Sequence, residues 1–209
     1  MILILKRIFD IVCALLGLIL LSPVMLIIAL LIKFSKYSTH GPIIFKQQRI
    51  GQYQIPFYIH KFRTMVVNSV ELGEQISTST DFRITRLGIL LRKTKLDELP
   101  QLFDVLCGYM SLVGPRPEVA EYVALYPEHV KQIIFSVKPG ITDWASIVMI
   151  DEGSILAKAD NPKTEYIQNI LPKKLDFAVK YVKTRTFMQD LLIIFTTIVN
   201  IFRPHRFKF

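Results

Sequence analysis

Two adjacent carboxylates, Asp97 and Glu98, occupy the stretch of this chain with the clearest potential for chemistry. Three basic residues precede them closely: Arg92, Lys93 and Lys95. Neighbouring positive charge favours the ionised form of both acids at neutral pH. An ionised, positioned carboxylate can attack phosphorus or hold a divalent metal ion. The pair is therefore a candidate catalytic or metal site, although acids at such a position also serve only to cap a helix.

A helix is expected to position this pair. Apolar residues recur at spacings of three and four from Leu96 to Leu106, which is the period of an amphipathic helix. Pro100 fits the first turn, because the N–H that proline lacks has no partner there. The acids then lie at the helix N-terminus, where free N–H groups and the helix dipole favour carboxylate or phosphate.

Basic residues that could hold phosphate occur at three places around the pair. Lys61 and Arg63 alternate, so an extended backbone projects both to one side, as a solvated edge strand also would. Arg92 follows residues 83–91, which read as a helix leading into the acids. Arg116 lies between two prolines on a stiff backbone, so it loses little entropy on gripping a phosphate.

Composition points to a membrane surface. The chain has 209 residues, enough for about one domain, and it is 51% hydrophobic with a formal net charge of +9. No acidic residue occurs between Asp10 and Glu71. This combination favours an anionic membrane as the first partner and nucleic acid as the second.

An uncharged apolar run covers residues 11–32. As a straight helix it would be about 33 Å long, enough to span a bilayer core. Ser22 and Pro23 interrupt the run, and proline removes one helical hydrogen bond, so a kink is expected there.

Basic residues flank the run on both sides: Lys6, Arg7, Lys33 and Lys36. A spanning helix would put one of these pairs outside, against the positive-inside tendency. A re-entrant hairpin that bends at Ser22-Pro23 and returns keeps both pairs on the cytoplasmic side. The run by itself leaves this hairpin and a kinked transmembrane helix both open.

The remaining segments are assigned by pattern. Short strands are expected at 43–45 and 56–59, with a turn at 48–51; helices at 118–137 and 175–183; a turn at 138–142; and loops over 151–174. The apolar segment 187–202 and the basic-aromatic tail 203–209 read as an interfacial helix and tail on the membrane.

Several short motifs, taken together and in order, resemble the small monotopic phosphoglycosyl transferases, the bacterial sugar transferase family. They comprise Lys6-Arg7 with Asp10, Ser22-Pro23, Gln48-Arg49-Ile50-Gly51, Lys61-Phe62-Arg63-Thr64-Met65, Arg83, Leu87-Gly88, Leu96-Asp97-Glu98-Leu99-Pro100-Gln101-Leu102, Met110-Ser111-Leu112-Val113-Gly114-Pro115-Arg116-Pro117 and Lys138-Pro139-Gly140-Ile141-Thr142. They cover nearly the whole chain.

The resemblance implies an α+β, mostly helical fold in three parts. Residues 1–36 would form a re-entrant membrane helix hairpin broken at Ser22-Pro23. Residues 37–186 would form a compact cytoplasmic catalytic domain with interfacial amphipathic helices and a few short strands, and 187–209 the interfacial helix and basic-aromatic tail. The implied location is the cytoplasmic face of the bacterial inner membrane.

The resemblance also implies an activity. Such enzymes move a sugar-1-phosphate from a UDP-sugar to undecaprenyl phosphate and release UMP, which begins surface-glycan synthesis. Asp97 matches the nucleophile, and Glu98 matches the partner acid associated with Mg²⁺, which both acids are expected to hold. Basic residues are expected to bind the substrate phosphates: Lys61, Arg63, Arg92 and Arg116.

Two other classes remain as alternatives: a membrane-tethered basic nucleic-acid-binding protein and a noncatalytic scaffold. Neither has a use for Asp97 and Glu98, and no recognised nucleic-acid motif is present. Residues 143–147 and 151–153 depart from a common pattern of the family, so the sequence does not fix the sugar. The sequence also does not determine the oligomeric state, and a homodimer is possible.

Overall fold

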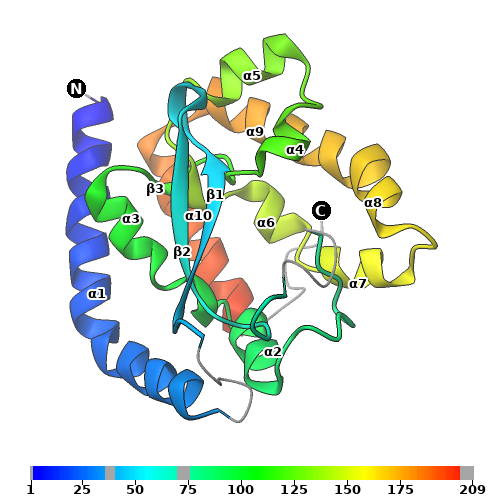
Figure 1. The fold of residues 1–209 in the computed structure, drawn as a ribbon. Coiled ribbons are helices and arrows are strands. Elements are labelled where there is room, and N and C mark those ends of the chain that lie inside the picture. The colour runs from blue at the N-terminus through cyan, green and yellow to red at the C-terminus, as the bar shows by residue number, and fades with distance from the viewer. Residues whose placement is uncertain (1, 36–40, 70–75, 203–209) are drawn as a thin grey trace.

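A computed structural model describes residues 2–35, 41–69 and 76–202, and shows helices arranged around two small sheets (Figure 1). The long helix α1 (Ile2–Phe34) lies along one side, and a strand hairpin lies in the centre. The expected α+β, mostly helical class is confirmed.

Helix α1 continues through Pro23 without a turn. Ser22 Oγ donates to the Ile19 carbonyl at 2.8 Å, and Figure 1 shows that the helix bends partway along its length. Among the described residues, its segment 4–34 is the one long and apolar enough to cross a membrane, by length and composition. The expected kink is therefore present, but as a bend in one helix.

Both halves of α1 pack against the rest of the chain. In the N-terminal half, Ala14 is fully buried against Val105 of α3 (Gln101–Cys107). In the C-terminal half, Ile28 and Ile32 are buried with Leu91 of α2 (Arg86–Lys93). One face of the whole helix thus belongs to the core of the protein.

Polar contacts fasten the start of α1 to strand β3 (Ser111–Val113) and helix α10 (Phe187–Phe202). Lys6 Nζ lies 2.6 Å from the Asp190 carboxylate and donates to the Val113 carbonyl at 3.1 Å. Asp10, which is 3% exposed, accepts from the Ser111 hydroxyl at 2.8 Å. The first turns of α1 are therefore tied to the strand that leads to Arg116.

The central hairpin pairs β1 (Ile44–Ile50) with β2 (Pro56–Phe62) in antiparallel register. The two expected strands are confirmed but longer, and the expected turn at 48–51 is wrong because 48–50 complete β1. The connection lies at 51–55 and contains the short η1 (Gln52–Gln54). Alternation along β2 buries Phe57 and Ile59 on the face that Lys61 shares.

The second sheet pairs β3 with β4 (Gly140–Thr142) in parallel. The expected turn over 138–142 is thus corrected in its last three residues, which are extended. A Cβ atom on Gly140 would collide with the backbone nitrogen of Gly114. Only residues without a side chain allow the two segments to approach so closely, and this approach brings the segments after β3 and β4 together.

Helices make up the C-terminal half. The helix expected over 118–137 is two helices, α4 (Ala120–Val123) and α5 (Glu128–Ile134), because Pro127 cannot continue the first. α6 (Trp144–Val148) follows.

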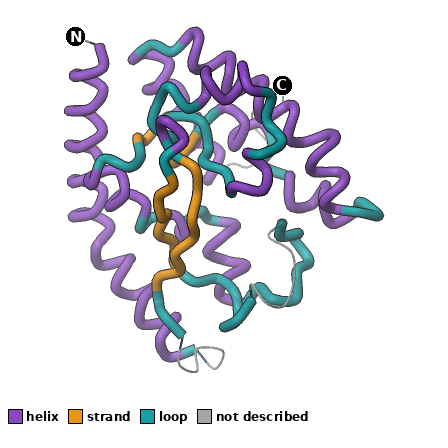
Figure 2. The backbone as a smooth tube through the Cα atoms, turned by 45° about the horizontal axis from the view of Figure 1, so that its top comes forward, coloured by secondary structure: helices purple, strands orange, loops and turns teal. Residues whose placement is uncertain are grey.

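The loops expected over 151–174 are wrong. This region forms α7 (Glu152–Lys158), α8 (Pro162–Glu165) and the π-helical turn η3 (Tyr166–Ile170), and then enters α9 (Leu171–Thr184), which confirms the helix at 175–183 (Figure 2). Asn161 caps α8, because its side chain accepts from the Thr164 N–H at 3.0 Å. Local capping therefore forms helices where the composition is polar.

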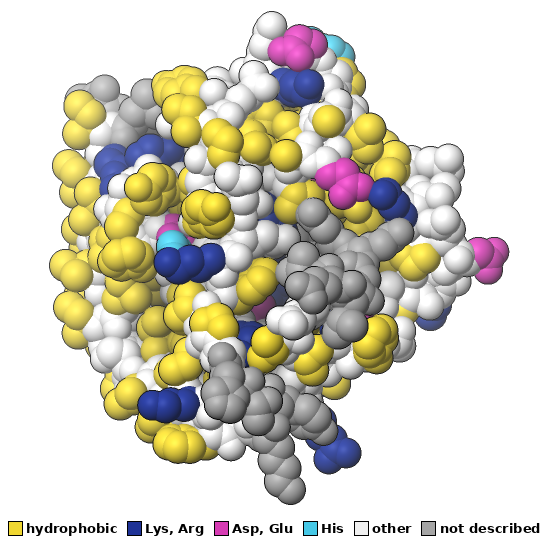
Figure 3. Space-filling model, in the orientation of Figure 1, with side chains coloured by type: hydrophobic (Ala, Val, Ile, Leu, Met, Phe, Trp, Pro, Cys, Tyr) yellow, Lys and Arg dark blue, Asp and Glu magenta, His cyan; other side chains and the backbone are white. Residues whose placement is uncertain are grey.

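Apolar side chains remain exposed on α1 and α10. Figure 3 shows hydrophobic side chains gathered on the side of the molecule where α1 lies in Figure 1. On α10, Ile193 is fully buried whereas Phe195 is 63% exposed, so the expected helix at 187–202 is confirmed and is amphipathic. The basic-aromatic tail expected at 203–209 lies outside the described residues.

Candidate active site

The acid pair lies in a short 3₁₀ turn, η2 (Leu96–Glu98), directly before α3. Lys95 enters this turn with a left-handed φ of 59°, and Pro100 is the N-cap of α3. The prediction that both acids lie at a helix N-terminus is confirmed, with a 3₁₀ turn in place of the first α-helical turn. Asp97 and Glu98 are each 7% exposed.

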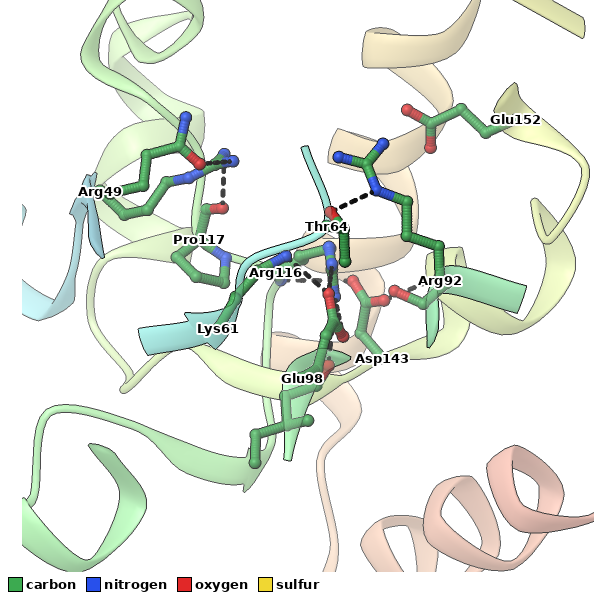
Figure 4. A network of polar contacts seen from close by, with 12 residues as sticks. Arg49, Lys61, Thr64, Arg92, Glu98, Arg116, Pro117, Asp143 and Glu152 are labelled. Carbon is green, nitrogen blue, oxygen red and sulfur yellow. Dashed lines mark hydrogen bonds and ion pairs between the residues drawn. The ribbon is translucent and has the colours of Figure 1, made fainter. Parts of the chain in front are cut away.

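Glu98 is held by two cations from distant segments. Lys61 Nζ donates to Oε1 at 2.7 Å, and the guanidinium of Arg116 binds both carboxylate oxygens (Figure 4). Burial would raise the pKa of Glu98, but Arg116 and Lys61 outweigh it and hold that pKa well below its usual range. Glu98 therefore stays ionised.

Asp97 has a different environment. Burial raises its pKa, and the neighbouring charge of Glu98 raises it further, against the effect of Lys61. Among the described residues, its buried Oδ1 has no hydrogen-bond partner, and neither has the buried Nε2 of Gln101, one helical turn further on. Buried polar atoms nearly always have partners, so these two mark a place where a ligand or water belongs.

Arg92 forms another side of the site. Its Nε donates to Thr64 Oγ1 at 2.9 Å and its Nη1 to Ser77 Oγ at 2.7 Å. Burial lowers the pKa of Arg92, and Asp97 opposes that effect, which shows that the two charges interact. In Figure 4 the guanidinium of Arg92 faces the carboxylate of Glu152 from α7.

The structure brings most of the predicted phosphate-binding residues together, but not all. Lys61, Arg92 and Arg116 surround the acids. Strand β2 ends at Phe62, so the alternation does not continue to Arg63, whose guanidinium lies close against Gly41. A phosphate-binding role for Arg63 stays a prediction.

Arg116 is also held through its backbone. Its N–H donates to Asp143 Oδ2 at 3.3 Å, and its Nη1 donates to the Ile141 carbonyl at 3.3 Å. Asp143 in turn caps α6 by accepting from the Ser146 N–H at 2.8 Å. Glu98 raises the pKa of Arg116 despite burial, so this guanidinium is firmly protonated.

Further residues around Arg116 were not assigned a role from the sequence. Arg49 donates to the Pro117 carbonyl at 3.2 Å and binds Glu118 at 2.5 Å, and the hydroxyl of Tyr166 donates to Glu118 at 2.6 Å. Glu118 directly follows Pro-Arg-Pro, and Arg49 lies in the motif Gln48-Arg49-Ile50-Gly51, so the sequence does carry a signal for these two residues. Tyr166 and Asp143 come from distant segments, which no local pattern reveals.

The arrangement suits chemistry at phosphate. Carboxylates in a buried turn, with three cations around them, can receive an anionic phosphorus centre and stabilise the charge that develops during transfer. Within the described ranges, no group of three or more His, Cys, Asp and Glu side chains could hold a metal ion. Two carboxylates suffice for Mg²⁺ when substrate phosphates supply other ligands.

Comparison with known proteins agrees with this chemistry. The family model described as "Bacterial sugar transferase" matches residues 1–204. The chain is 38% identical to a UDP-N-acetylgalactosamine-undecaprenyl-phosphate N-acetylgalactosaminephosphotransferase of Aeromonas hydrophila, over 94% of this chain and 43% of the relative. It is 37% identical to the UDP-glucose:undecaprenyl-phosphate glucose-1-phosphate transferase of Escherichia coli K12, over 93% of this chain and 39% of the relative.

The chain therefore spans less than half the length of these two relatives. A third relative is similar over almost its full length: the exopolysaccharide production protein PSS of Rhizobium leguminosarum is 35% identical over 95% of both chains. The segment that the family model matches, residues 1–204, includes α1, α10 and every residue of the site described above. The chain belongs to the bacterial sugar transferase family.

Proposed function

We propose that this protein transfers a sugar-1-phosphate from a UDP-sugar to undecaprenyl phosphate and releases UMP, as the first membrane step of surface-glycan synthesis. The observation that carries the proposal is the buried pair Asp97–Glu98 surrounded by Lys61, Arg92 and Arg116. The names of the relatives from A. hydrophila and E. coli describe this type of transfer. The nucleic-acid-binding and scaffold alternatives give the acid pair no role.

The transfer would proceed in two displacements. A carboxylate oxygen of Asp97 attacks the sugar-bound phosphorus, the bond from that phosphorus to the bridging oxygen breaks, and UMP leaves. The phosphate of undecaprenyl phosphate then attacks the same phosphorus and displaces the Asp97 carboxylate. Each displacement forms one phosphorus–oxygen bond and breaks one, which predicts ping-pong kinetics.

Lys61 and Arg116 bind Glu98 in the structure, and both would meet the diphosphate from this position. Phosphoryl transfer depends on positioning and charge stabilisation more than on strong acids, which suits a site with several fixed cations. Arg92, anchored by Thr64 and Ser77, would meet the substrate from another side. Asp97 is the predicted nucleophile, and these cations surround it.

A magnesium ion fits the donor set. Glu98 and Asp97 would hold it together with substrate phosphate oxygens, and the unpartnered Oδ1 of Asp97 is the observation that supports this. When bound, Mg²⁺ would neutralise negative charge on the diphosphate. The protein groups around it would orient the donor and exclude water.

Helix α1 would enter the membrane, bend at Ser22-Pro23 and return to the same side, as a re-entrant helix. Both halves of α1 pack on the same body of the protein, and charged residues at its start are tied to β3 and α10, so the helix lies beside the site instead of leading away from it. Exposed apolar side chains line its outer face: Leu16, Ile19, Leu20, Ile27 and Leu31. In this arrangement the site faces the cytoplasm at headgroup level, where the lipid phosphate lies.

One assay tests the activity. Purified protein in lipid, with Mg²⁺ and a panel of UDP-sugars, should release UMP and leave a radiolabelled phosphosugar on the protein when no acceptor is added. Asp97→Asn should abolish both signals. The proposal fails if Asp97→Asn remains fully active, or if no UDP-sugar gives release with the unaltered protein.

A second experiment tests the topology. Tags at the two ends of α1, before Lys6 and after Lys33, should both be labelled from the cytoplasmic side of the inner membrane. Labelling of the N-terminal tag from the periplasm would show a spanning helix and refute the re-entrant arrangement.

A further inference from the structure

A connected group of side chains lies behind Arg116, outside the residues proposed to meet substrate. Arg49 in β1 donates to the Pro117 carbonyl at 3.2 Å and to Glu118 Oε1 at 2.5 Å. The hydroxyl of Tyr166 donates to Glu118 Oε2 at 2.6 Å. Both oxygens of the Glu118 carboxylate are therefore occupied, and the carbonyl next to Arg116 is held (Figure 4 shows Arg49 and Pro117).

Tyr166 is buried, Arg49 and Glu118 are partly buried, and the group is also fixed through its backbone. The side chains of Arg49 and Glu118 are 17% and 15% exposed, and Tyr166 is 3% exposed. The Ile50 N–H donates to the Glu118 carbonyl at 2.9 Å, which joins the segment to β1. Burial would raise the pKa of Glu118, but Arg49 and Lys174 hold it below the usual value, so the carboxylate stays charged.

A contribution to folding stability alone does not explain the contacts among Arg49, Glu118 and Tyr166. Buried ion pairs contribute little net stability, because desolvation offsets the attraction between the charges. Tyr166 is also the first residue of the π-helical turn η3. Single π-helical turns are rare in proteins, and those that occur are often found at functional sites. The Nζ of Lys174 lies 4.9 Å from the centre of the Tyr166 ring and pairs with the carboxylate of Glu152 at 2.8 Å. The same carboxylate of Glu152 faces Arg92 in Figure 4.

We propose that Arg49, Glu118 and Tyr166 form a clamp that positions Arg116 for the substrate diphosphate. The clamp fixes the backbone just after Arg116, while Asp143 fixes the N–H of Arg116 itself. Held on both sides, Arg116 needs only to turn its side chain from Glu98 to a phosphate, and it loses little conformational entropy on doing so. The three are positioning residues, and their role rests on the proposed function.

A double-mutant cycle tests the clamp. Tyr166→Phe removes only the hydroxyl, and we expect it to lower kcat/KM for UMP release about tenfold, the loss typical of a hydrogen bond to a charged group. In an Arg116→Met background the same substitution should cause no further loss, because the residue through which it acts is gone. Affinity for UMP, measured by calorimetry, should follow the same pattern, so the test holds even where Arg116→Met has no turnover.

Tyr181→Phe is the matched control. Tyr181 is 2% exposed, and its hydroxyl donates to the Asp190 carboxylate at 2.7 Å and lies 3.2 Å from the Val113 carbonyl of β3. The substitution therefore removes an equally buried hydroxyl that also bonds a carboxylate, but one that does not contact the segment 116–118. Its effect should be equal with and without Arg116. If Tyr166→Phe does not fold, as judged by thermal unfolding, Arg49→Lys replaces it in the cycle. Lysine keeps the charge but lacks the planar guanidinium whose Nη1 donates to both Pro117 and Glu118.

The outcomes separate the two proposals. If the losses from Tyr166→Phe and Arg116→Met multiply, Tyr166 acts independently of Arg116 and the clamp is wrong. The clamp also fails if Tyr181→Phe loses its effect in the Arg116→Met background just as Tyr166→Phe does. If the unaltered protein releases no UMP from any UDP-sugar and does not bind UMP, the proposed function itself fails.

Discussion

Asp97 and Glu98 are neighbours in the chain, yet their surroundings move their pKa values in opposite directions. Burial and the charge of Glu98 raise the pKa of Asp97, whereas Arg116 and Lys61 overcome burial and lower that of Glu98. Such a separation is how adjacent acids acquire different tasks. Glu98 is suited to remain a fixed charge, because Lys61 and Arg116 bind it. Asp97 is suited to react, because its Oδ1 has no hydrogen-bond partner among the described residues.

The raised pKa of Asp97 predicts a pH effect. Only ionised Asp97 can attack, so labelling by the phosphosugar should fall as pH drops through this raised pKa. Glu98→Gln removes the neighbouring negative charge, lowers the pKa of Asp97, and should move the acid limb of the normalised profile to lower pH. The measurement is the initial rate of phosphosugar labelling against pH. A limb that stays in place or moves to higher pH would contradict this assignment.

At the scale of elements, the short β3–β4 pair aligns the site. Arg116 follows β3 and Asp143 follows β4, and the parallel pairing brings the two into contact. The pairing depends on the close backbone approach of Gly114 and Gly140. A sheet of two three-residue strands thus fixes the position from which the Arg116 side chain extends.

Gly140→Ala should therefore be costly. Its Cβ would push the two segments apart, and we expect the free energy of unfolding to fall by about 2 kcal/mol or more. Gly153→Ala in α7 is the control: the nearest atom to its Cβ would lie at 3.5 Å, an ordinary contact, so stability should hold or rise slightly. Thermal unfolding of the two variants in the same detergent makes the comparison. Equal stability of both would show that the glycine contact is unimportant.

The sequence predicted the parts of the site that depend on local pattern. Helical period and Pro100 placed the acids at the start of α3. Strand alternation placed Lys61 on one side of an extended segment, but it did not predict that this side is buried. It could not predict that Tyr166 reaches Glu118, because that contact depends on packing between distant segments. Polar composition also hid the helices of residues 151–174, where capping by Asn161 outweighs average hydrophobicity.

At the scale of the whole molecule, the exposed apolar side chains of α1 and α10 are suited to contact with lipid. Exposed apolar residues on α1 and on α10 gather on helices that also contribute buried residues to the core. An amphipathic helix with such an outer face is suited to lie in the interface between headgroups and acyl chains. The site would then meet its lipid acceptor without drawing the lipid out of the bilayer.

Charges placed on α10 should weaken this attachment. Phe195 and Ile198 are 63% and 50% exposed, so a Phe195→Glu, Ile198→Glu double variant should fold but bind vesicles of anionic lipid less strongly in a flotation assay. Ile155→Glu on α7, a helix on the opposite side from α1 in Figure 1, should float like the unaltered protein. If the α10 variant floats equally well, this helix does not touch the membrane.

The ion pair between Lys6 and Asp190 joins residues 184 positions apart. During synthesis α1 is therefore made well before the Asp190 carboxylate that completes its polar anchorage. Contacts between such distant parts of a chain form late in folding. The polar anchorage of α1 is therefore complete only after α10 has been synthesised and has packed beside it.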